Sequence, residues 1–171
     1  MALLEVISLP DKRLRMRAQE VETITDEIRI LMSDMLETMY VTDGIGLAAI
    51  QVGILKRIAV IDLGEARFQT APLKMVNPEI IWEIDEKQVV PDGCLSVPDQ
   101  FAETLRPKAL KVRFRDENDR VQELEAEGLL AACIHHEVDH LNGVLFVDHL
   151  SPLKRQILVG RVLKLNKSKK K

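Results

Sequence analysis

The sequence predicts a protein of the α+β class, with mixed or antiparallel sheets packed around a central helix and another helix at the C-terminus. Two segments with helical periodicity stand apart from a run of short strands, and no strand–helix–strand unit repeats along the chain. The 171 residues are 46% hydrophobic and 30% charged, which suits one domain with a substantial core. We therefore expect a single folded domain over residues 1–165 and a flexible basic tail over residues 166–171.

The first helix is expected at residues 26–40, where Thr25 or Asp26 can cap its start. A methionine-rich stripe runs along it, and we expect this stripe to pack in the core rather than to form a binding groove. The apolar residues that recur at the spacing of one helical face are Ile28, Leu31, Met32, Met35, Leu36 and Met39.

A loop is expected at residues 44–51, and strands follow it along the middle of the chain. The last two strands alternate in hydrophobicity on either side of a polar turn at 116–119, which indicates a hairpin. The strands are expected at residues 57–63, 74–84, 88–91, 108–115 and 120–126.

Two more helices are expected, the second at residues 127–141 and the third from Pro152 to Leu165. Gly143 is well placed to end the second helix, because glycine accepts the left-handed backbone that follows many helices. Proline is favourable in the first turn of a helix, so Pro152 can open the third.

Composition narrows the class of protein. No run of about 18 apolar residues is present, and the first residues lack a basic leader with a small-residue cleavage site. We therefore expect a cytoplasmic protein without a membrane span, whose two cysteines do not form a disulfide. The net charge of −3 is uneven: residues 1–148 contain 16 basic and 27 acidic residues, and the remainder contains eight basic residues and no acidic one.

The most informative segment is His136-Glu137-Val138-Asp139-His140, within the second expected helix. Residues four apart lie on one helical face, so His136 and His140 can bind one metal ion. Glu137 is then a candidate base for a metal-bound water, an arrangement that indicates metal-dependent hydrolysis. The preceding apolar run, residues 129–134, predicts a buried helix, in which imidazoles without partners would be costly.

A catalytic site of this kind usually has a third protein ligand. Cys133 precedes His136 on the same face, but it lies about 10.5 Å along the helix axis from His140, too far for both to bind one ion. We therefore expect Cys133 to line the approach to the metal. His135 and Asp139 point away from the ligand face and suit supporting roles.

Cys94 is the remaining candidate, since His149 lies beyond the helix end and is assigned no metal role. Gly93 and Pro98 flank Cys94 and indicate a constrained loop or strand end. On spacing alone, Cys94 is equally well read as a ligand or as a buried structural cysteine.

Three segments together resemble the signature motifs of the peptide deformylase family. They are Gly44-Ile-Gly-Leu-Ala-Ala-Ile-Gln51, Gly93-Cys-Leu-Ser96 and His136-Glu-Val-Asp-His140, and the resemblance extends over essentially the whole chain. It implies an α+β enzyme that removes the formyl group from N-formylmethionine on newly synthesised polypeptides and releases formate. It also implies that one divalent metal ion is bound per chain, Fe²⁺ physiologically, with Zn²⁺, Ni²⁺ or Co²⁺ able to replace it.

The resemblance also assigns roles to individual residues. Cys94, His136 and His140 correspond to the metal ligands, and Glu137 to the general acid and base that serves the metal-bound water attacking the formyl carbon. Gln51 and the backbone N–H of Leu95 correspond to the donors that stabilise the oxyanion, and the backbone of Gly46 to a contact with the substrate chain.

The methionine side chain of the substrate needs a pocket close to the metal. Leu129, Ala132 and Cys133 precede His136 on the same helical face, and with Ile45 they are candidates to form it. The alternative is that these four residues serve core packing alone.

Three positions depart from the pattern that is common in the family. Asp92 stands where glutamate is common, His135 where glutamine is common, and Phe101 where a basic residue is common. None of them removes a ligand, the base or an oxyanion donor. We expect Asp92 to pair with Arg106 and support the segment that carries Cys94; the alternative is that both charges are solvated.

The expected partners are N-formylmethionyl nascent peptides, without DNA or a membrane, and the protein is expected to be a monomer in a bacterial-type cytoplasm. Lys154, Arg161 and Lys164 fall on one side of the third helix, which favours a contact with ribosomal RNA; a solubilising end is the alternative. Two other functions are alternatives: an HExxH endopeptidase with a third ligand other than Cys94, and a non-catalytic ribosome- or RNA-binding protein with a structural metal.

Overall fold

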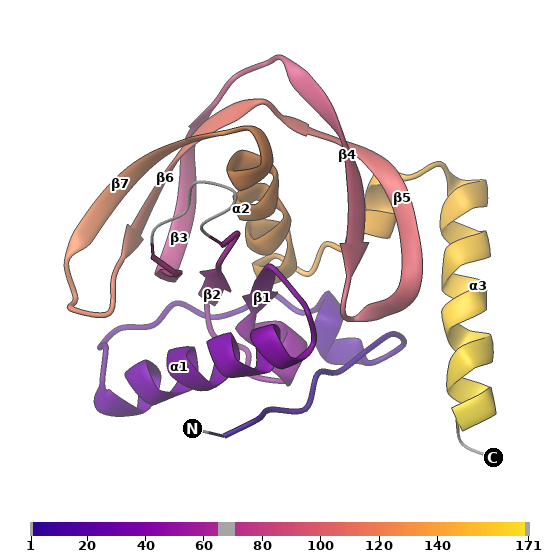
Figure 1. Cartoon of the computed structure of the whole chain (residues 1–171), viewed down its shortest axis with the longest axis horizontal. Helices are drawn as coiled ribbons and strands as arrows, with labels where there is room; N and C mark the ends of the chain where they lie inside the picture. Colours follow the sequence, from indigo (N-terminus) through magenta and orange to yellow (C-terminus); the bar gives the residue numbers. More distant parts are fainter. Residues whose placement is uncertain (1, 65–70, 170–171) are drawn as a thin grey trace.

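A computed structural model describes residues 2–64 and 71–169 and confirms the α+β class. Figure 1 shows the helix α2 (Gly128–Leu141) enclosed between a larger sheet and a long hairpin, with α3 (Pro152–Lys169) outside the hairpin and α1 (Asp26–Val41) beneath. The larger sheet is antiparallel, in the order β1-β2-β3-β6-β7, and the hairpin β4-β5 forms a separate two-stranded sheet. The strands are β1 (Gly46–Ala48), β2 (Ile58–Ile61), β3 (Leu73–Glu83), β4 (Lys87–Cys94), β5 (Val97–Pro107), β6 (Ala109–Arg115) and β7 (Val121–Glu127).

The helix α1 forms as the apolar spacing predicts. Thr25 caps it, with its Oγ1 accepting a hydrogen bond from Ile28 N at 3.3 Å. Met32, Met35 and Met39 are completely buried in a core cluster that includes residues of β1 and β2. The methionine stripe therefore packs in the core and does not form a groove.

Two segments in the first two-thirds of the chain differ from the prediction. The expected loop at 44–51 contains the strand β1 and a 3₁₀ helix, Ala49–Val52. The strand β5, eleven residues long, is not predicted at all. Its buried positions include Gln100, Thr104 and Arg106, so the alternation that identifies a strand is absent from the hydrophobicity pattern.

Buried polar contacts fix the end of α2. The helix ends at Leu141, and Gly143 follows with φ of 77°, the left-handed conformation expected there. Leu141 O accepts hydrogen bonds from Arg57 Nη1 and from Ala18 N, both at 2.9 Å. Because a cation at a helix C-terminus is favourable, the buried Arg57 stabilises the helix that carries the two histidines.

The third helix continues past the predicted end at Leu165. Residues 166–169, expected to be a flexible tail, are helical, and Asn166 Nδ2 donates a 2.6 Å hydrogen bond to Leu9 O. Leu158 and Val162 are buried against the core, which anchors the middle of the helix. Residues 170–171 lie outside the described part of the chain. Within residues 2–64 and 71–169, no helix has the length and apolar character needed to cross a membrane.

Candidate metal centre

Three side chains bring one sulfur and two nitrogen atoms together between α2 and β4. His136 and His140 lie four residues apart on α2, and their Nε2 atoms are 3.0 Å apart. Cys94 is the last residue of β4, and its Sγ lies 3.3 Å from His140 Nε2. The three donor atoms all lie within 4.8 Å of one another, so the helix and the hairpin meet at one possible metal-binding site.

The other residues considered as ligands lie elsewhere. Cys133 is not one of the three converging residues, as its distance from His140 along the helix predicts, and it lines a cavity beside them. His135 and Asp139 contact the buried guanidinium of Arg106, whose Nη1 lies 2.9 Å from His135 Nδ1 and 2.7 Å from Asp139 Oδ2. His149 joins the same group, with its Nε2 2.8 Å from Asp139 Oδ2. His135, Asp139 and His149 thus surround the guanidinium group of Arg106.

Asp92 connects this cationic group to the metal centre. Its Oδ2 accepts hydrogen bonds from Arg106 Nη2 and Thr104 Oγ1, both at 2.8 Å, and its Oδ1 lies 2.9 Å from His136 Nδ1. Burial alone would raise the pKa of Asp92, but His136 and Arg106 together hold it well below its ordinary value. The predicted ion pair with Arg106 is therefore confirmed, whereas the contact with His136 was not predicted. A carboxylate on Nδ1 orients an imidazole so that its Nε2 faces the other donors.

Glu137 is buried beside this cluster. Only 3% of the residue is exposed, and its Oε2 has no hydrogen-bond partner among the described residues. Burial raises the pKa of Glu137 to about 7, although the positive charge of His136 acts to lower it. Such a carboxyl group can gain or lose a proton near neutral pH, as a general acid and base must.

Gln51 also faces the donors, from the 3₁₀ helix after β1. Its Oε1 accepts a 2.9 Å hydrogen bond from Ala48 N, which fixes the orientation of the amide. Its Nε2 then donates to Cys94 Sγ and to Ser96 Oγ, both at 3.3 Å. Gln51 is 1% exposed, so it is not a solvated loop side chain. Leu95 follows Cys94 in the tight turn between β4 and β5.

One cavity of about 690 Å³ opens onto the cluster. Cys94, His136 and Glu137 lie on its wall. So do the remaining residues that were expected to bind substrate or stabilise the oxyanion: Ile45, Gly46, Gln51, Leu95, Leu129, Ala132 and Cys133. Residues of β4 and β5 that the sequence did not predict at the site, including Val90, Pro91 and Phe101, complete the wall.

Comparison with known proteins decides the family. The sequence profile described as polypeptide deformylase matches residues 3–156. The chain belongs to the polypeptide deformylase family. As a deformylase it is a hydrolase that acts on a formyl amide.

Relatives of this deformylase match it over nearly their full length. A peptide deformylase from Afipia carboxidovorans is 49% identical over 167 residues, which cover 98% of each chain. A crystal structure of a peptide deformylase from Legionella pneumophila is 39% identical, with a TM-score of 0.91 and 99% of each chain covered. A peptide deformylase from Ehrlichia chaffeensis, in complex with actinonin, is 40% identical, with a TM-score of 0.91 and coverage of 96% of this chain and 98% of that one.

The residues at the centre of this deformylase fit a divalent transition metal. One cysteine and two histidines are typical ligands of such ions, whereas Mg²⁺ and Ca²⁺ prefer oxygen ligands. Burial and the neighbouring His136 lower the pKa of His140 well below its ordinary value, which favours the neutral imidazole that binds metal. The unpartnered, buried Glu137 Oε2 also suits a site that is complete only with further groups bound.

Proposed function

We propose that this deformylase holds one divalent metal ion between Cys94, His136 and His140 and there removes the formyl group from N-formylmethionine at the start of newly made polypeptides. The proposal rests chiefly on the convergence of three donor atoms within 4.8 Å, in a wall of the cavity that also contains the buried Glu137. Family membership supports the same reaction.

Each polar group near the donors suits one part of this hydrolysis. When bound, the ion would supply Lewis acidity and make water nucleophilic near neutral pH. Glu137, with its pKa near 7, accepts the proton of the attacking water and returns a proton to the leaving amine, so formate and a free amine result. Gln51 Nε2, fixed through its own Oε1, and the N–H of Leu95 stabilise the tetrahedral oxyanion.

The peptide chain of the substrate has an entry between two strand edges. β1 is the edge of the larger sheet, and β4 pairs only with β5 among the described strands. Gly46 on β1 and Gly93 on β4 both line the cavity. A Cβ on Gly46 would lie 3.1 Å from Glu137 Oε1, so glycine keeps the space beside the base open. An extended main chain can pair with such edges.

The methionine pocket is assigned to Ile45, Leu129, Ala132 and Cys133, which form an apolar part of the cavity wall. We expect Ala132→Phe to raise KM for formyl-Met-Ala by about tenfold or more, because the added ring would fill space that the methionine side chain needs. Steady-state assays of formate release measure this effect, and formyl-Gly-Ala serves as a substrate with no side chain to displace. Unchanged kinetics for formyl-Met-Ala in a folded variant would reject the assignment.

Ferrous iron is proposed as the physiological ion, with Zn²⁺, Ni²⁺ or Co²⁺ able to replace it. Mixed cysteine and histidine ligation accepts all of these ions, so the ligand set does not select among them. A cysteine thiolate beside iron is susceptible to oxidation. The protein should therefore be purified without oxygen before its metal content is measured.

The direct test combines metal content with product analysis. The protein purified without oxygen should contain one metal ion per chain and release formate from formyl-Met-Ala but not acetate from acetyl-Met-Ala. His140→Ala should lose the ion and the activity together. An absence of formate release from metal-loaded protein would overturn the proposal, and cleavage of internal peptide bonds would favour an endopeptidase instead.

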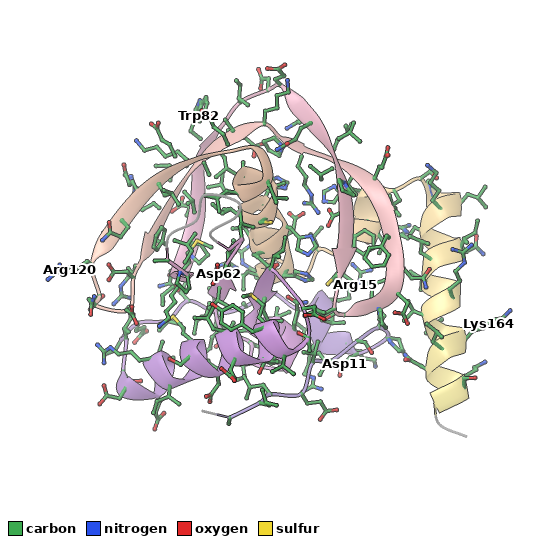
Figure 2. The ribbon with its side chains drawn as sticks, viewed as in Figure 1. Asp11, Arg15, Asp62, Trp82, Arg120 and Lys164 are labelled. Atoms are coloured by element: carbon green, nitrogen blue, oxygen red, sulfur yellow. The ribbon has the colours of Figure 1, made fainter. Side chains whose placement is uncertain are left out.

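We also propose that α3 contacts ribosomal RNA, which would place the enzyme where formylated chains emerge in a bacterial-type cytoplasm. Lys154, Arg161 and Lys164 are exposed on this helix, and Lys164 points away from the body of the protein (Figure 2). Positive charges on one helix suit contact with phosphates. A monomer is proposed, because the exposed large apolar residues are spread over α1, α2, α3 and several strands.

Replacing Lys154, Arg161 and Lys164 together with Gln is expected to weaken co-sedimentation with ribosomes severalfold at low salt, while formate release from short peptides stays unchanged. Because the three side chains are exposed, the packing of α3 on the core is preserved. A matched control replaces three exposed cations outside α3, namely Lys87, Lys108 and Arg120. Arg120 and Lys164 lie on opposite sides of the molecule in Figure 2. Equal binding by the α3 variant and the control would reject the contact.

A further inference from the structure

An aromatic ring stands almost fully exposed at the rim of the cavity. Phe101 is 76% exposed, yet it belongs to the wall of the cavity that holds the metal centre. A phenylalanine this exposed keeps apolar surface in contact with water, which is unfavourable unless another molecule covers it. A ring in this position is therefore available to a bound molecule and contributes little to the core.

The hairpin fixes where this ring lies. Phe101 on β5 is opposite Gly93 on β4, the residue just before Cys94. A Cβ on Gly93 would lie 2.5 Å from Phe101 Cδ1 and 2.7 Å from Cε1, so the ring lies directly against the Gly93 backbone. The absence of a side chain at Gly93 thus leaves room for the ring at this point, one residue from a proposed metal ligand.

Phe101 lies on a different element from the methionine pocket, in a part of the cavity wall that contains two prolines and the acidic Asp99. Pro91 and Pro98 line the same cavity beside Phe101, on the hairpin, whereas Leu129 and Ala132 lie on α2. A formyl group at the metal centre and a methionine side chain against α2 leave the next residues of the substrate to extend along the hairpin. Phe101 is the largest of the apolar side chains that the hairpin contributes to this wall, which also include Val90 and Leu95.

We propose that Phe101 is a specificity-determining residue that contacts the side chain of one of the two residues following methionine and favours a large apolar side chain there. The inference rests on the proposed deformylase function of the same cavity. An aromatic contact of this kind contributes about 0.5–1.5 kcal/mol, which corresponds to a preference of roughly twofold to twelvefold in kcat/KM.

The test compares formate release from two series of substrates, formyl-Met-X-Ala and formyl-Met-Ala-X, with X as Phe, Leu, Ser or Asp. We expect the protein to prefer Phe and Leu over Ser in at least one series, and Phe101→Ser to reduce that preference to less than twofold, measured as the ratio of kcat/KM values within the variant. Phe101→Arg should instead favour Asp over Phe, because an opposite charge near the substrate side chain attracts it.

Trp82→Ala is the matched control, because Trp82 is an exposed aromatic residue, 53% exposed, near the end of β3 and outside the cavity wall (Figure 2). It should retain the preference of the unmodified protein. The inference is overturned if the unmodified protein shows no preference in either series, or if Phe101→Ser and Phe101→Arg keep it. If none of the formylated substrates released formate, the proposed function itself would be overturned instead.

Discussion

Glu137→Gln is expected to lower kcat for formate release by about 10²–10⁴-fold, the range that general acid–base catalysis contributes. Glutamine has nearly the same shape, but it cannot accept the proton of the attacking water. Because Glu137 contributes no donor atom to the cluster of Cys94, His136 and His140, the metal content should remain unchanged. Steady-state formate assays, together with metal analysis of the same preparation, measure both quantities.

A matched control is Glu125→Gln, which removes an exposed carboxylate on β7. It should leave kcat within about twofold of the unmodified protein, since surface changes away from a site are usually small in effect. Full activity in the Glu137 variant with metal bound would show that another group transfers the proton, and the role assigned to Glu137 would then be wrong.

Arg106→Ala is expected to destabilise the fold by about 3–5 kcal/mol, the usual cost of removing one partner of a buried ion pair. Arg106 is completely buried and contacts both Asp92 and Asp139, so its loss leaves two largely buried carboxylates without their cation. Because Asp92 also contacts His136, metal affinity should fall as well. Urea unfolding and competition with a chelator measure these two effects.

The pH dependence of the Arg106 effect has a definite sign. Arg106 helps to hold the pKa of Asp92 below its ordinary value, so the stabilisation is present above about pH 4 and is lost as the pH falls. The difference between Arg106→Ala and the unmodified protein should therefore be largest near neutral pH and shrink in acid. Arg106→Lys retains the positive charge but lacks the planar guanidinium group that can contact two carboxylates at once. It should therefore recover only part of the lost stability and metal affinity. Equal stability and metal affinity in the alanine variant would show that the ion pair is dispensable.

The sequence predicts the helices of this protein better than its strands, for a physical reason. In α1 the buried positions are apolar, so helical spacing identifies them directly. In β5 the buried positions include Thr104 and Arg106, whose partners come from β4 and α2. A strand whose inner face is made of paired polar groups carries no alternating pattern, and only the tertiary contacts explain it.

The residues of the candidate site also differ in how well the sequence predicts their positions. Helical geometry alone places His136 and His140 together and excludes Cys133, because these are relations within one helix. The position of Cys94 depends on how a hairpin lies against that helix, so spacing alone does not distinguish a metal ligand from a buried structural cysteine, and only the resemblance to a family assigns it as a ligand. The contact of His149 with Asp139 had no signal in the sequence, since the two residues approach only after the chain turns beyond α2.

The separation of the two sheets has a thermodynamic consequence for the folded state. β4 and β5 are hydrogen-bonded in one sheet, β1, β2, β3, β6 and β7 in another, and the three donor atoms lie where the hairpin meets α2. An ion bound to all three would act as a reversible cross-link over a loop of about 40 residues, and such links stabilise more as the loop they close lengthens. Free metal concentration would then set the melting temperature as well as the turnover rate, because a ligand that binds only the folded chain shifts unfolding by mass action.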